Sequence, residues 1–101
     1  MKCKYGNIQQ SSLSLNSNDI INQIFKLLPY KESQEKDLQS HFTTILFRIN
    51  GMAQLFPSEP RWITVMALLE SAKEENDFRL YRKAILDCCS IVRNITGDAD
   101  A

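Results

Sequence analysis

The sequence predicts an all-α protein, an antiparallel helical bundle of three longer helices and one short N-terminal helix. Two segments carry apolar residues at the alternating three- and four-residue spacing of helices that pack side by side. Between them lies a segment that is apolar almost all round, as expected of a helix buried on several sides. The chain has 101 residues with only 3 Gly and 3 Pro, too few for the frequent turns of an all-β sandwich. We therefore expect a single helical domain over residues 17–97.

The N-terminal part of the chain predicts an arm followed by a short helix. Residues 1–16 are rich in Ser, Asn and Gln and show no helical period, so we expect a flexible polar arm. The first helix is expected to begin at Ser17 or Asn18, which are good N-cap residues. It should end at Pro29, because the residue before a proline avoids helical angles. A helix this short is marginal alone and must pack against other helices.

The second helix is expected from about Lys31 to Phe56. Its first turns are charged, and a heptad-like apolar seam follows, formed by Leu38, Phe42, Ile45, Ile49, Met52 and Phe56. Gly51 lies inside this pattern, where glycine costs up to about 1 kcal/mol relative to alanine. We interpret it as a tolerated or closely packed glycine rather than a kink.

The third helix is expected over about residues 59–75. Pro57 ends the helix before it, Ser58 is expected to cap it, and Pro60 suits its first turn, where a missing N–H has no cost. The segment from Trp62 to Leu69 leaves almost no polar face. A buried strand is the competing interpretation, and the length of the segment favours a helix.

The fourth helix is expected to begin after Asn76 and Asp77 and to end at Gly97, a typical residue just past a helix end. It carries the second apolar seam, formed by Phe78, Tyr81, Ile85, Cys88, Val92 and Ile95. Residues 98–101 are expected to form a frayed acidic tail. The two seams are of matched length, and the short connections favour antiparallel neighbours.

The composition excludes several classes of protein. Twelve Lys and Arg balance twelve Asp and Glu, so the chain is not a polycation, and 44% hydrophobic residues exclude a disordered tail. No run is long and apolar enough for a membrane helix or a secretory signal. The three cysteines, Cys3, Cys88 and Cys89, make a poor disulfide framework. We therefore expect a reduced, cytoplasmic protein.

No pattern in the sequence predicts catalysis. His41 is the only histidine, with Asp37 one turn earlier, but no third member of a triad can be identified. Cys88 and Cys89 are adjacent and diverge by about 100° on a helix, so they cannot readily chelate a metal together. No phosphate-binding loop occurs. We expect no catalytic residue, no metal, no cofactor and no small-molecule substrate.

Some apolar residues fall outside the helical seams. Phe47, beside Arg48, lies on the outward side of the second helix, Leu80 on that of the fourth, and Ile63 off the apolar line of the third. Two interpretations stay open: the first helix and the arm cover them, or they form a contact surface. The second makes Phe47, Leu80, Ile63 and Arg48 candidate residues of a protein interface, for a homodimer or for another protein.

A cluster of basic residues offers a second function. Arg79, Arg82 and Lys83 can share one outward face of the fourth helix, as phosphate binding requires. The chain as a whole is neutral, whereas nucleic-acid-binding domains are usually basic. We therefore expect a non-enzymatic protein–protein interaction module, acting as an adaptor, an assembly factor or a small inhibitor of a larger protein machine. Its size suits inhibitors encoded by phages or mobile elements, an analogy at the level of fold only.

Overall fold

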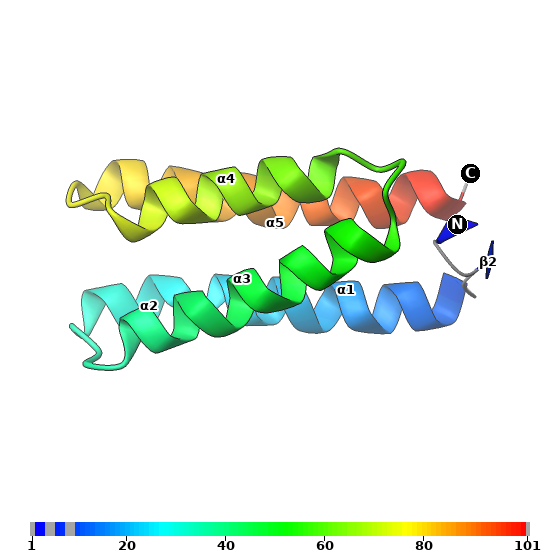
Figure 1. Ribbon diagram of the computed structural model, residues 1–101. Coiled ribbons are helices and arrows are strands. Elements are labelled where there is room, and N and C mark those ends of the chain that lie inside the picture. The colour runs from blue at the N-terminus through cyan, green and yellow to red at the C-terminus, as the bar shows by residue number, and fades with distance from the viewer. Residues whose placement is uncertain (1, 4–5, 8–9, 101) are drawn as a thin grey trace.

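The protein is an all-α bundle, as the sequence predicts. The computed structural model describes the chain except residues 1, 4–5, 8–9 and 101, and it describes no side chains for residues 1–12, 14 and 98–100. A two-residue antiparallel ladder precedes the helices, with Lys2 opposite Asn7 and Cys3 opposite Gly6. The elements in order are β1 (Lys2–Cys3), β2 (Gly6–Asn7), α1 (Gln10–Phe25), α2 (Leu27–Glu32), α3 (Leu38–Leu55), α4 (Arg61–Lys73) and α5 (Phe78–Asp100) (Figure 1).

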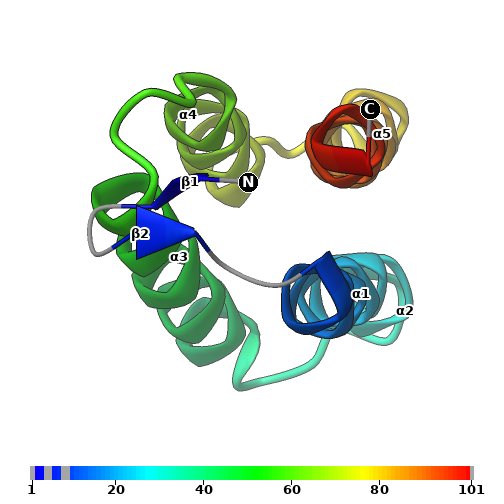
Figure 2. The same ribbon diagram turned by 90° about the vertical axis from the view of Figure 1, so that its right-hand side faces the viewer.

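The helices occupy four corners of an elongated bundle, with α2 continuing the direction of α1 (Figures 1 and 2). The described chain measures 41 × 21 × 20 Å along its principal axes. Successive long helices run in opposite directions, which is the arrangement that short connections favour. Helix α5 packs along both α1 and α4, and α3 packs along α4, whereas α3 and α1 touch over a shorter length. The bundle is therefore less tightly closed between α1 and α3.

The first helix is longer than the sequence suggested. It begins at Gln10, so the expected start at Ser17 or Asn18 is wrong, and part of the predicted arm over residues 1–16 is helical. Leu13 and Ser17 are both buried, one turn apart, and they extend the apolar face back from Ile20. The serine breaks the apolar pattern in the sequence, which conceals the helical period. Flexibility of the arm remains a prediction, because most of its remaining residues lie outside the described ones.

Pro29 does not end the helical segment. A turn at Lys26 separates α1 from α2, and Pro29 is the third residue of α2, where an N–H would have no partner within that helix. The backbone N–H of Tyr30 donates to the Lys26 carbonyl at 3.2 Å, so the helical path continues past the proline. Gln34, with a left-handed φ of 55°, then lies in the connection to α3. The helix that the sequence predicts from Lys31 is α3, and it begins at Leu38.

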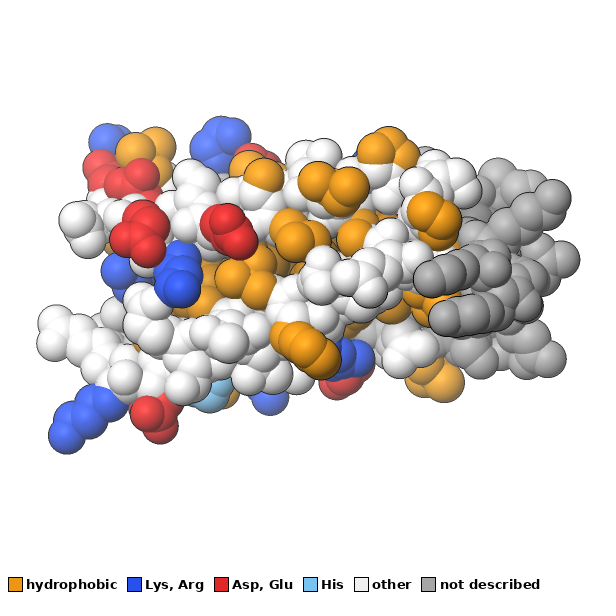
Figure 3. All heavy atoms as spheres, viewed as in Figure 1, with side chains coloured by type: hydrophobic (Ala, Val, Ile, Leu, Met, Phe, Trp, Pro, Cys, Tyr) orange, Lys and Arg blue, Asp and Glu red, His pale blue; other side chains and the backbone are white. Residues whose placement is uncertain are grey.

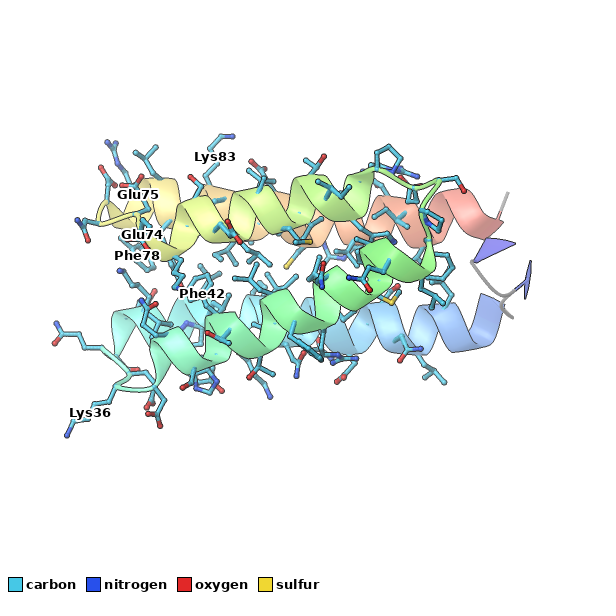
Figure 4. All side chains as sticks on the ribbon, in the orientation of Figure 1. Lys36, Phe42, Glu74, Glu75, Phe78 and Lys83 are labelled. Carbon is cyan, nitrogen blue, oxygen red and sulfur yellow. The ribbon has the colours of Figure 1, made fainter. Side chains whose placement is uncertain are left out.

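The two predicted seams form the core, together with one face of α1 and α2. On α3 and after it, Phe42, Ile45, Ile49 and Phe56 are buried, and on α5 every seam residue after Phe78 is buried. Phe78, Leu38 and Met52 are partly buried against this core. Figure 4 shows Phe42 and Phe78 near one end of the bundle, where they flank the buried Tyr81 ring at centroid distances of 6.2 and 6.1 Å.

Helix α4 buries one stripe rather than most of its surface. Trp62, Val65, Leu69 and Ala72 are buried, whereas Ile63, Thr64 and Ala67 are exposed. The helix occupies a corner, and among the described elements it packs closely only against α3 and α5, so its outer side is exposed. The prediction of a helix buried on several sides is wrong for this reason.

Of three helix ends, two differ from the sequence-based expectation and one agrees with it. The cap of α4 comes from Glu59 and not from Ser58, because the Glu59 carboxylate accepts the backbone N–H of Arg61 at 3.1 Å. Hydrogen bonds from Arg61 lower the pKa of Glu59. Asp77 caps α5 as predicted, since its Oδ1 accepts the N–H of Arg79 at 2.9 Å. Gly97 does not end α5, which continues to Asp100 through part of the predicted frayed tail.

Candidate functional site

The strongest candidate for a functional surface is the outer side of α3. The exposed residues of this helix are all uncharged, and we call them the α3 outer face: Gln39, Ser40, Thr43, Thr44, Phe47, Gly51 and Gln54. Phe47 lies at its centre and is 78% exposed, the largest exposed fraction among the exposed large hydrophobic side chains of the described chain. The Thr43 hydroxyl donates back to the Gln39 carbonyl at 3.0 Å, which reduces the polarity that the face offers to solvent.

Charge is distributed unevenly over the molecule. Figure 3 shows most of the charged side chains of its view at one end, near the connection between α4 and α5. The same view shows hydrophobic side chains along α4 and in the seam between α3 and α4. Leu46, Ala53 and Met66 are among the partly buried hydrophobic residues of these two helices. Because the α3 outer face carries no charged side chain, another protein can cover it without desolvating an ion.

The other two apolar residues that the sequence selected are also exposed, but they do not form one patch. Ile63 is 61% exposed and Leu80 is 54% exposed. Each is the third residue of its helix, and α4 and α5 begin at opposite ends of the bundle. Ile63 belongs to α4, the neighbour of α3, whereas Leu80 lies beside the basic residues of α5. Neither is covered by the first helix within the described chain.

Arg48 has a different place from the one expected. Its guanidinium donates to the carboxylate of Asp19 and, at 2.8 Å, to the side-chain oxygen of Gln23. Both partners lie on α1, so Arg48 links α3 to α1. These two helices otherwise pack against each other over only a short length. Less than a third of its side chain is exposed. Arg48 is therefore engaged within the bundle and does not flank Phe47 as a free cation.

The three candidate basic residues of α5, Arg79, Arg82 and Lys83, are exposed, and two of them have acidic neighbours on the same helix or its cap. Lys83 pairs with Asp87 at 3.0 Å, and Arg79 lies 4.0 Å from Asp77. Arg82 is exposed as well. Figure 4 shows Lys83 pointing away from the bundle, with Glu74 and Glu75 at the adjacent end. The acidic neighbours reduce the positive potential that the cluster offers to a phosphate.

His41 stacks on Tyr30 rather than pairing with a carboxylate. The two rings lie 4.3 Å apart between centroids and are inclined by 15°. They line a shallow hollow of about 150 Å³ between α1, α2 and α3, together with Gln23, Lys26, Thr44 and Ile45. Its lining has no carboxylate and no thiol, and the hollow is smaller than the usual 300–1,000 Å³ of a ligand site. No pattern in the sequence indicates this stack, because Tyr30 and His41 belong to different helices.

The cysteines of α5 are core residues. Cys88 and Cys89 are both buried and free, with Sγ atoms 3.8 Å from the Val65 carbonyl and 3.9 Å from the Ile21 carbonyl. Burial raises the pKa of Cys88 to about 12 and also raises the pKa of Cys89, so neither is a ready nucleophile. Among the described residues no three His, Cys, Asp or Glu side chains gather as a metal site requires.

Comparison with known proteins adds no functional information. No family model matches the chain, and neither a curated protein nor a solved structure matches it at a significant level. Over the described residues, no helix combines the length and hydropathy needed to cross a bilayer. A function for this chain must therefore be argued from its own surface.

Proposed function

We propose that the chain is a non-enzymatic protein–protein interaction module that binds its partner through the α3 outer face. The observation that carries the proposal is Phe47, a large aromatic side chain that is 78% exposed at the centre of a surface without charge. Burying such a side chain stabilises a complex by about 1.5–3 kcal/mol. Buried aromatic anchors of this kind dominate the energetics of protein interfaces.

The shape of the molecule fits a passive binding role. The described helices form one bundle with a continuous core, in which Cys88 and Cys89 are buried and His41 is stacked on Tyr30. An adaptor, an assembly factor or a small inhibitor of a larger machine needs only such a scaffold and one binding face. The free thiols of Cys88 and Cys89 favour a reducing compartment such as the cytoplasm.

Ile63 is the residue most suited to enlarge this interface. It is exposed on α4, the helix that packs along α3, and the seam between the two helices is apolar. Leu80 lies at the opposite end of the bundle, beside charged residues of α5, so we assign it no part in the same contact. Arg48 contributes indirectly, by holding α3 against α1.

A photo-crosslinking experiment tests the proposal in cells that make the protein naturally. The photoreactive p-benzoylphenylalanine replaces Phe47 in one variant and Leu80 in a matched variant, since both positions are exposed and apolar. We expect a specific protein adduct from position 47 and none of comparable yield from position 80. No adduct at position 47, or the same adducts from both positions, would contradict an interface on α3.

The alternative function is a nucleic-acid accessory protein that uses Arg79, Arg82 and Lys83. Exposure of all three side chains on α5 supports it, and the pairing with Asp77 and Asp87 weighs against it. This function requires binding to duplex or single-stranded probes that weakens steeply with salt. Replacing the three cations by glutamine should then abolish binding. Absent or salt-insensitive binding removes the alternative.

A further inference from the structure

Gly51 is a residue that the isolated chain does not need. It lies inside α3 at an ordinary helical conformation, where glycine is less stable than alanine by about 0.5–1 kcal/mol. A Cβ added at this position would meet nothing within 4 Å, so no neighbour inside the bundle requires the space. Of the two interpretations offered by the sequence, a glycine packed closely within its own fold is therefore wrong, and a glycine tolerated by the fold agrees with the open space. A glycine on an exposed helix surface allows a side chain of another molecule to approach the helix backbone closely.

Phe47 and Gly51 are one turn apart on the same exposed face. Residues four positions apart on a helix are neighbours, so the protruding aromatic ring and the missing side chain lie next to each other. We propose that a second copy of this chain docks on the α3 outer face, with Phe47 of each copy packed over Gly51 of the other. This inference rests on the proposed function and names its partner.

Two-fold symmetry makes the pair of features self-complementary. In an isologous contact, residue i of one copy meets residue j of the other, and j then meets i. A protrusion and a space on one face, one turn apart, satisfy this condition with the two α3 helices antiparallel about an axis between the residues. A different protein would have to supply a matching protrusion and space of its own. The second copy already carries both.

The charge of the face supports the same occupant. A two-fold axis brings identical surfaces together, so any charge near the axis would face a like charge. None of the exposed residues of α3 is charged, and Arg48, the only Lys, Arg, Asp or Glu of that helix, is paired with Asp19. The face is therefore free of the self-repulsion that the basic part of α5 would cause. A contact centred on one helix is small beside the usual interface of about 800 Å² per partner, so the dimer should dissociate on dilution.

Sedimentation equilibrium of the purified full chain over a wide concentration range tests the inference. We expect a concentration-dependent monomer–dimer equilibrium in the wild type. Phe47→Ala removes the protrusion and Gly51→Leu fills the space, and each should raise the dissociation constant at least tenfold. Gly97→Leu is the matched control, because Gly97 is also an exposed helical glycine with open space around it. It should leave the dissociation constant unchanged, and circular dichroism verifies that every variant keeps its helix content.

The photoreactive p-benzoylphenylalanine at position 47 tests how the two α3 helices are aligned, with position 47 of one copy over Gly51 of the other. In a mixture of ¹⁴N- and ¹⁵N-labelled chains, the adduct should join a ¹⁴N chain to a ¹⁵N chain. The crosslinked site on the second chain should lie in α3, around Gly51. A wild type that stays monomeric, or a dimer that persists in both variants, overturns the inference. If the chain is monomeric while position 47 crosslinks to a different protein, self-association is wrong and the interaction module stands. If no adduct forms at all, both proposals fail.

Discussion

The hydroxyl of Tyr81 donates a buried hydrogen bond of 2.8 Å to the carbonyl oxygen of Leu27. The bond joins α5 to α2 across 54 positions of sequence, at the point where the chain resumes its helix after the turn at Lys26. The Tyr81 ring is packed between Phe42 and Phe78, and the Lys31 ammonium lies 5.2 Å from its centre. Burial raises the pKa of this hydroxyl to about 12, so it stays a donor at physiological pH.

We expect Tyr81→Phe to lower the free energy of unfolding by about 1 kcal/mol, because it removes this bond and keeps the ring contacts. Urea denaturation followed by circular dichroism measures the change. Tyr30→Phe, on a partly buried residue whose hydroxyl has no such buried bond, is the matched control and should have little effect. Equal stabilities of the Tyr81 variant and the wild type would mean that the bond contributes nothing net.

The N-terminal half of α1 gives a second test. Leu13 is fully buried, so Leu13→Ala should destabilise the protein by about 2–4 kcal/mol through lost burial and a residual cavity. Leu15→Ala makes the same chemical change two residues away at a side chain that is 73% exposed. It should cost less than about 0.5 kcal/mol. Similar small effects of both variants would return residues 10–16 to the flexible arm that the sequence suggested.

These two leucines also mark the limit of what the sequence predicts about the fold. Unbroken apolar seams, as on α3 and α5, identify most of the core correctly, and their members Leu38, Met52 and Phe78 are partly buried against it. A seam that contains a polar member, as α1 does at Ser17, loses its period and is missed. Pro29 misleads for a related reason, since the local rule that proline ends a helix does not say whether a second helix begins two residues earlier. Local patterns locate elements, and tertiary packing decides where they begin and end.

The candidate site was predictable in part. The heptad pattern places Phe47 and Leu80 outside the core, the apolar line of the third helix does the same for Ile63, and all three are exposed. The pairing of Arg48 with Asp19 and Gln23 depends on how α3 lies against α1, which no local pattern specifies. The lack of charge on the outer side of α3 was visible in the sequence as a single Lys, Arg, Asp or Glu between Leu38 and Leu55. That signal gains meaning only once the exposed side of the helix is known.

The contact between α3 and α1 provides a third prediction. Arg48→Met and Asp19→Asn, alone and together, form a double-mutant cycle for the ion pair. Because both side chains are partly exposed, the coupling free energy should be small, about 0.2–1 kcal/mol, and should fall in high salt. Thermal unfolding of the four proteins measures it. A coupling that is zero at low salt would show that the pair does not hold α3 against α1.

Gly51 gives a prediction about the monomer. Gly51→Ala should raise the free energy of unfolding by about 0.5–1 kcal/mol, because alanine is the better helix former and its Cβ meets no neighbour. Urea unfolding of both proteins is measured at a protein concentration low enough for the monomer to dominate. A destabilised variant would indicate that the glycine serves the fold of the single chain, contrary to the role proposed for it at a dimer interface.

The buried thiol of Cys88 makes stability depend on alkaline pH. Its pKa rises from an ordinary value of 9.0 to about 12 in the folded chain, because burial disfavours the thiolate. The folded value lies above the unfolded one, so this contribution is complete below pH 9 and is lost as the pH rises from 9 toward 12. The unfolding free energy should fall by up to about 1.4 kcal/mol per pH unit for this thiol, because the unfolded chain releases its proton first.

Urea unfolding at pH 8, 9 and 10 tests this dependence, in a range that keeps Tyr81 protonated in the folded chain. Cys88→Ala should be less stable at pH 8, because it leaves a cavity, yet should lose less stability between pH 9 and 10 than the wild type. The adjacent Cys89 thiol has a raised pKa as well, so Cys89→Ala should also flatten the profile. Profiles of equal slope in all three proteins would mean that both thiols ionise as readily in the folded chain as in the unfolded one.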